Sequence, residues 1–143
     1  MFKFKLKIVD ELKSNLSMKV YFLNPKKLNP IENYDYDRVN WLKDKIKKEK
    51  IWTVPIAIAQ EHNLIMDGHH RLQVALKLNL KKIPCFIYSY NQIEPYSLRK
   101  EEEVTSKIII ENFLKSKIFP YKTAKHDLIS PVIQPINLGD LYL

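Results

Sequence analysis

Five consecutive residues in the middle of the chain carry side chains suited to binding an anion. They are Asp67, Gly68, His69, His70 and Arg71. Gly68 lets the backbone approach a ligand closely, Asp67 can cap a helix or hold a metal, and the histidines and the arginine add hydrogen-bond donors. Cationic side chains near a helix N-terminus oppose the helix dipole unless an anion binds there. The motif therefore predicts a phosphate or carboxylate site; an Asp67 cap beside solvated histidines is the alternative.

The residues on either side predict how this motif is positioned. Residues 63–66 predict a short buried strand, and apolar residues at helical spacing predict a helix over residues 68–78. A strand-to-helix turn points several backbone N–H groups and the positive end of the helix dipole at one spot. The elements thus place the polar side chains where an anion would be stabilised.

The surrounding residues predict a mixed α+β fold. A strand over residues 18–23 is followed by turn-forming residues 24–30 and by a helix that begins near Asp35 or Asp37 and ends near Lys50. Val39, Leu42 and Ile46 mark the buried stripe of that helix. Strands are predicted over residues 53–59 and 81–90, and a tight turn at 61–63 makes a hairpin that leads into the motif. The order of elements is α, β, β, α, β.

The segments before and after this central region predict an edge strand at the start and a helix and a tail at the end. Residues 2–8 alternate apolar residues with lysines, as in an edge strand, and residues 91–99 are loop-like. A third helix is predicted over residues 104–118, preceded by three glutamates and with its buried stripe formed by Ile108, Ile109, Phe113 and Leu114. Residues 128–138 are β-prone but interrupted by two prolines, which predicts an edge strand. We expect one domain over residues 1–143, with a core over 18–90 and a C-terminal helix and tail over 91–143.

Composition limits the classes of protein to which the chain can belong. The net charge of +8 and pI near 9.4 suit an anionic partner such as a nucleotide or nucleic acid. The single cysteine, Cys85, lies in an apolar run and predicts a core residue in a reducing compartment. No run is long and apolar enough to span a membrane and the start lacks a signal-peptide core, so we expect a cytoplasmic protein. Trp41 is predicted to pack in the core and Trp52 in a lid over it, rather than to stack on bases.

The motifs in this order resemble a known superfamily. Residues 18–90 resemble the ParB/sulfiredoxin core, and within it the chain is most similar to the free L-serine kinases. Two further segments support that subfamily, because residues 28–32 resemble its catalytic-glutamate segment and residues 119–126 its C-terminal signature. Sulfiredoxin itself is disfavoured, because its motif carries a nucleophilic cysteine in the turn and this turn has none. The resemblance implies an α+β fold with a small mixed sheet flanked by helices and a C-terminal helix plus tail.

The resemblance also implies an activity, the transfer of a phosphoryl group from ATP or ADP to free L-serine with Mg²⁺. Glu32 would be the general base, and Asp67 would bind Mg²⁺ directly or through water. The phosphates would be held by Gly68, His69, His70 and Arg71, and the amino acid by Lys122, Thr123 and His126, with Arg99 a weaker candidate. The chain departs from the subfamily at Leu98, Ala124 and Lys125, where we expect tryptophan, threonine and arginine, and these changes bear on amino-acid affinity.

Two alternatives share the same residues. A regulatory module that binds nucleotide or DNA without catalysis would fit the positive charge, although the sequence shows no helix-turn-helix. A nuclease on the same scaffold would also use Asp67, because the Asp-Gly-His-His-Arg element has relatives in nucleases, CTP-binding partition proteins and sulfiredoxins. The resemblance over residues 119–126 favours the kinase.

Overall fold

A four-stranded mixed sheet carries the turn on which the predicted site lies. The computed structural model describes residues 18–143, so the strand predicted over residues 2–8 lies outside the described residues. The strand order is β1 (Tyr21–Leu23), β5 (Ile83–Tyr88), β3 (Ile56–Ala59) and β4 (Ile65–Asp67). β3 runs parallel to β5, whereas β1 pairs with β5 and β4 pairs with β3 in antiparallel fashion. The predicted mixed α+β fold and the hairpin before the motif are thus confirmed.

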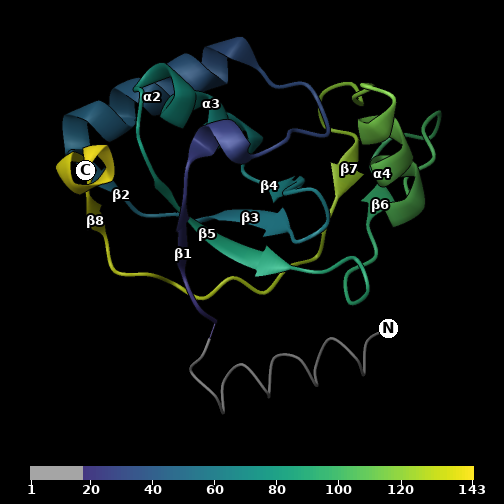
Figure 1. Cartoon of the computed structure of the whole chain (residues 1–143). Helices are drawn as coiled ribbons and strands as arrows, with labels where there is room; N and C mark the ends of the chain where they lie inside the picture. The colour runs from purple at the N-terminus through teal and green to yellow at the C-terminus, as the bar shows by residue number, and fades with distance from the viewer. Residues whose placement is uncertain (1–17) are drawn as a thin grey trace.

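Both faces of the sheet are covered, which explains why every residue of β3 is buried. Successive side chains of a strand point to opposite faces. Ile56 and Ile58 belong to the apolar cluster beneath α2 (Tyr36–Glu49) and α3 (His69–Lys77), whereas Ala57 and Ala59 belong to a second cluster that includes residues of α4 (Ser106–Leu114). Figure 1 shows α2 and α3 together over the sheet, with α4 set apart beside β6 (Tyr96–Ser97) and β7 (Ala124–Lys125).

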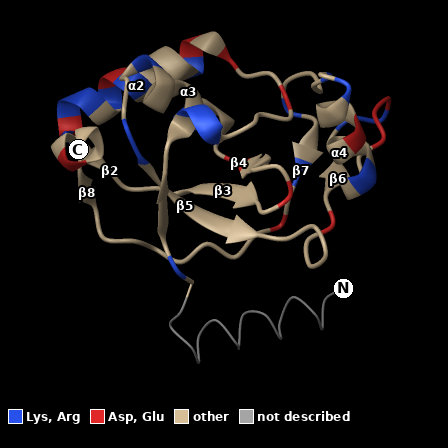
Figure 2. Cartoon of the chain, viewed as in Figure 1, with Lys and Arg blue, Asp and Glu red and all other residues tan. Residues whose placement is uncertain are grey.

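Helix α2 forms as its sequence predicts. The carboxylate of Asp35 caps the helix by accepting hydrogen bonds from the backbone N–H groups of Asp37 and Arg38, at 3.0 and 3.3 Å. The predicted stripe of Val39, Leu42 and Ile46 is buried, and Lys50 ends the helix in a left-handed conformation. Figure 2 shows charged residues spread along α2, while the strands β3 and β5 are free of them.

The C-terminal elements are shorter than predicted. The helix expected over residues 104–118 is α4, Ser106–Leu114, which begins after the cap residue Thr105 and so leaves the three glutamates outside its first turn. Ile109 is buried, but Leu114 is 65% exposed and was wrongly assigned to the buried stripe. The strand expected over 128–138 reduces to β8 (Ile136–Asn137), which pairs with β2 (Ile51–Trp52) and leads into η2 (Leu138–Tyr142). The predicted turn at 24–30 contains the short helix η1 (Pro25–Lys27).

The two tryptophans occupy the opposite of their predicted environments. Trp52 is only 1% exposed and donates from its indole nitrogen to the carbonyl oxygen of Val54 at 2.8 Å, so it is a core residue. Trp41 is 64% exposed and is not in the core. The reason is helical geometry, because Trp41 precedes the buried Leu42 by one residue and therefore lies about 100° around the helix from it. None of the helices formed by residues 18–143 is long and apolar enough to cross a membrane.

Candidate active site

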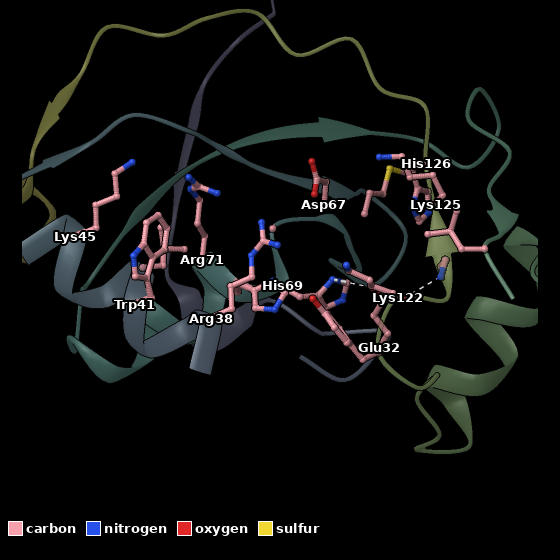
Figure 3. A pocket seen from close by; sticks show the side chains of 17 residues that line it. Glu32, Arg38, Trp41, Lys45, Asp67, His69, Arg71, Lys122, Lys125 and His126 are labelled. Carbon is pink, nitrogen blue, oxygen red and sulfur yellow. Dashed lines mark hydrogen bonds and ion pairs between the residues drawn. The ribbon is translucent and has the colours of Figure 1, made fainter. Parts of the chain in front are cut away.

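A pocket of about 510 Å³ opens where α2, the first turn of α3, the end of β4 and the C-terminal tail meet (Figure 3). Its wall contains five cationic side chains, from Arg38, Lys45, Arg71, Lys122 and Lys125, and two carboxylates, from Glu32 and Asp67. A concave site with this excess of positive charge favours an anionic ligand. All of the predicted site residues except Thr123 and Arg99 line this pocket, and they come from segments far apart in the sequence.

Glu32 is held in a fixed orientation by the tail. Its Oε2 accepts hydrogen bonds from the backbone N–H groups of Thr123 and Ala124 at 3.0 and 2.9 Å, and its side chain is only 13% exposed. Burial raises the pKa of Glu32 above its ordinary value, although the two backbone hydrogen bonds act in the opposite direction. Oε1 lies 4.0 Å from Nδ1 of His69. Glu32 is therefore a carboxylate whose proton affinity is enhanced and whose position is set by backbone donors.

The two histidines of the motif hold the segment that carries Glu32. Nε2 of His69 accepts from the backbone N–H of Ile31, and Nε2 of His70 accepts from that of Asp35, both at 3.1 Å. A neutral imidazole that accepts at Nε2 carries its proton on Nδ1, so these bonds fix both tautomers. Burial lowers the pKa of His69 to about 3 and also lowers the pKa of His70, which keeps both rings neutral. Only the Nδ1–H groups remain for the predicted phosphate contacts.

The tail folds back over the segment that carries Glu32. Phe119 donates its backbone N–H to the carbonyl of Ile31 and accepts from the N–H of Asn33, both at 2.9 Å. The segment with Glu32 is therefore bonded to the tail on both sides and to α3 through the histidines. Every one of these contacts joins residues more than 30 positions apart in the chain.

The turn between β4 and α3 requires glycine. Gly68 has φ of 114°, and a Cβ at this position would lie 3.1 Å from Cγ1 of Ile56, so both backbone conformation and packing exclude a side chain. Gly68 is also the N-cap of α3, with no side-chain hydrogen bond, so the alternative in which Asp67 caps the helix is wrong. The carboxylate of Asp67 instead lies in the pocket, where its charge interacts with that of Arg71 (Figure 3).

The donor set fits Mg²⁺ only together with a phosphate ligand. Among residues 18–143 there is no group of three His, Cys, Asp or Glu side chains that could hold a metal ion. Mg²⁺ in phosphoryl-transfer sites uses one or two carboxylates, with substrate phosphates and waters completing the octahedron. Asp67, alone at the end of β4 and beside cationic side chains, is compatible with that arrangement.

The predicted substrate-binding residues of the tail do not all reach the pocket. Lys122, Lys125 and His126 line it, but burial lowers the pKa of His126 to about 4, so this ring is neutral. Thr123 is fully buried and its hydroxyl donates to the carbonyl of Pro120 at 2.7 Å, which removes it as a substrate contact. Arg99 is likewise outside the pocket wall and donates from Nε to the carbonyl of Tyr121 at 3.1 Å. Thr123 and Arg99 therefore order the tail.

The structure adds three pocket residues from α2 that the sequence analysis missed. Arg38, Trp41 and Lys45 each precede a residue of the buried stripe, and so they form an adjacent stripe along the edge of the core. A tryptophan spaced at helical intervals between an arginine and a lysine was the available signal.

Comparison with known proteins identifies the family of this chain. The model of the ParB N-terminal domain matches residues 9–113, so the chain belongs to that family. It is 34% identical over 70 residues, 49% of its length, to a ParB-like protein of Sulfolobus acidocaldarius, and 39% identical over 57 residues, 37% of its length, to an ATP-dependent L-serine kinase of Desulfurococcus mucosus. The chain spans only 35% and 22% of these two relatives.

The fold also matches solved structures over most of the chain. A free serine kinase in complex with AMP superposes with a TM-score of 0.78, covering 87% of this chain and 94% of the kinase at 14% identity. The predicted ParB/sulfiredoxin-like α+β fold is therefore confirmed, and its structural neighbours include free serine kinases.

Proposed function

We propose that this protein transfers a phosphoryl group from ATP or ADP to the hydroxyl of free L-serine, forming O-phospho-L-serine. The observation that carries the proposal is the position of Glu32, a partly buried carboxylate held by two backbone N–H groups in a pocket lined by cationic side chains. The similarity to an ATP-dependent L-serine kinase and to a free serine kinase bound to AMP supports this reaction class.

Glu32 acts as the general base in the proposed reaction. It accepts the hydroxyl proton as the serine oxygen bonds to the transferred phosphorus, while the bond from that phosphorus to the bridging oxygen breaks and its electron pair leaves with the nucleotide. The raised pKa makes Glu32 a better proton acceptor than an ordinary carboxylate. The N–H groups of Thr123 and Ala124 hold Oε2, so that Oε1 is the oxygen available to take the proton.

The remaining groups divide between the two substrates. Arg71, the backbone N–H of Gly68 and the Nδ1–H groups of His69 and His70 bind the phosphates. Lys122 and Lys125 supply the positive charge for the amino acid's carboxylate, since His126 is neutral. Asp67 would hold Mg²⁺, which neutralises phosphate charge when it is bound.

The test is direct detection of the product. The protein is incubated with L-serine and Mg²⁺ with either ATP or ADP, and O-phosphoserine is measured by mass spectrometry. We expect product with at least one donor, and little product from serinamide, which lacks the carboxylate that Lys122 and Lys125 would bind. Glu32→Gln should lower turnover by about 10²-fold or more, whereas the exposed Glu111→Gln on α4 should not. Failure to form O-phosphoserine with either donor would overturn the proposal.

The cationic pocket also favours one other function, the binding of nucleotide or DNA without catalysis, and the same samples distinguish it. A gel shift with duplex DNA at physiological salt, without any product from serine, would support this binding module. Cleavage of plasmid DNA that is lost in Asp67→Asn would instead support a nuclease.

A further inference from the structure

Trp41 has an environment that packing does not explain. Its indole is 64% exposed on α2, yet it lines the pocket instead of lying on an outer surface. The other tryptophan, Trp52, is buried and hydrogen-bonded, as is usual for this side chain. A large aromatic ring held open to solvent within a concave, charged site is available for stacking on a planar ligand.

The charges around Trp41 indicate which planar ligand fits. Nζ of Lys45 lies 5.7 Å from the centre of the Trp41 ring, and Arg38 lies one helical turn before it on the same stripe. Arg38 and Arg71 are close enough for their charges to interact across α2 and α3. The aromatic ring and the cations thus provide a stacking surface next to an anion-binding surface, which matches a base joined to phosphates.

The order of the side chains along the pocket agrees with a nucleotide whose base lies beside Trp41. Figure 3 shows Trp41 and Lys45 at one end, Lys125 and His126 at the other, and Arg71 and Asp67 between them. Glu32, whose oxygen would take the acceptor's proton, lies toward the end formed by the tail. A nucleotide with its phosphates near Arg71 and Asp67 therefore has its base at the end formed by α2.

We propose that Trp41 is the platform on which the nucleotide base stacks, and that Arg38 and Arg71 hold the phosphates beside it. This inference rests on the proposed use of a nucleotide but not on the identity of the acceptor. Stacking requires only a π-face, so the site should accept adenine and guanine nucleotides with similar affinity. Loss of the ring should weaken nucleotide binding by about 5- to 150-fold, the range for stacking one base on an aromatic side chain.

The test separates the base from the phosphates. Affinities for ADP, GDP and inorganic tripolyphosphate are measured by calorimetry, without serine, for the parent, Trp41→Ala and Trp41→Phe. We expect Trp41→Ala to weaken ADP and GDP binding alike by about 5- to 150-fold and to leave tripolyphosphate unchanged, with Trp41→Phe close to the parent. ADP should quench the exposed component of the tryptophan emission in the parent and not in Trp41→Phe, because Trp52 is buried.

Tyr36→Ala is the matched control. Tyr36 lies on the same helix, is 59% exposed and has Nζ of Lys77 at 4.7 Å from its ring, but it is not part of the pocket wall. This variant should bind ADP like the parent. The inference is overturned if folded Trp41→Ala binds ADP normally, if it loses tripolyphosphate equally, or if the parent binds no nucleotide. A parent that shows the expected pattern yet makes no O-phosphoserine would overturn the proposed reaction and leave the role of Trp41 intact.

Discussion

Acidification should destabilise this fold through two buried histidines that belong to the site. Burial lowers the pKa of His69 to about 3 and that of His126 to about 4, whereas a histidine in an unfolded chain has a pKa of about 6.5. Between these values the unfolded chain binds protons that the folded chain does not. The stabilisation is therefore fully present above about pH 6.5 and is lost as the pH falls toward the folded-state values.

The magnitude follows from the pH interval. When the pH falls from about 7.5 to about 5, each histidine takes up a proton almost only in the unfolded state. The unfolded-state histidine is mostly protonated over about the last 1.5 pH units of this interval, from about 6.5 to about 5. At about 1.4 kcal/mol per unit, each lowers the free energy of unfolding by about 2 kcal/mol, and the two together by about 4 kcal/mol. Glu32 acts in the opposite direction, because its raised pKa makes the folded state take up a proton first.

The assay is urea unfolding at both pH values, followed by circular dichroism. All variants are made in a Glu32→Gln background, which removes the opposing carboxylate. His69→Gln and His126→Gln should each reduce the pH-dependent loss of the free energy of unfolding by about 2 kcal/mol. If the free energy of unfolding falls by the same amount in Glu32→Gln alone as in its His69→Gln and His126→Gln derivatives, the two rings are not the source of the pH dependence, and the reasoning is refuted.

Three further outcomes are expected of the site. The rate of serine phosphorylation should fall in acid with an apparent pKa above 4.5, and Glu32→Gln should abolish that limb along with most of the turnover; turnover close to the parent rate would remove Glu32 as the base. Arg71→Ala should weaken nucleotide binding in calorimetry, and unchanged affinity in a folded variant would exclude its role with the phosphates. Lys122→Gln should raise KM for serine by about 10-fold while leaving nucleotide affinity unchanged, and the opposite pattern would place Lys122 with the nucleotide.

Local rules in the sequence determined the elements that form the frame of the site. Helix α2 was predicted from its cap residue Asp35 and from the apolar stripe of Val39, Leu42 and Ile46. The turn from β4 into α3 was predicted from Gly68, which follows an apolar run. Capping, periodicity and turn chemistry act over a few residues, so they can be recognised without knowledge of the rest of the fold. The resemblance supplied Glu32 and the tail as candidates for the same site.

The tertiary structure alone decided what the individual side chains contact. His69 and His70 were expected to face phosphates, but their Nε2 atoms hold the segment around Glu32. Trp41 is exposed because it lies on the side of α2 that the core does not cover, whereas Trp52 is buried in β2, which pairs with β8. The histidine contacts join residues 35 and 38 positions apart, and the contacts of Glu32 join residues 91 and 92 positions apart. No local pattern encodes which partner a side chain will meet at such separations.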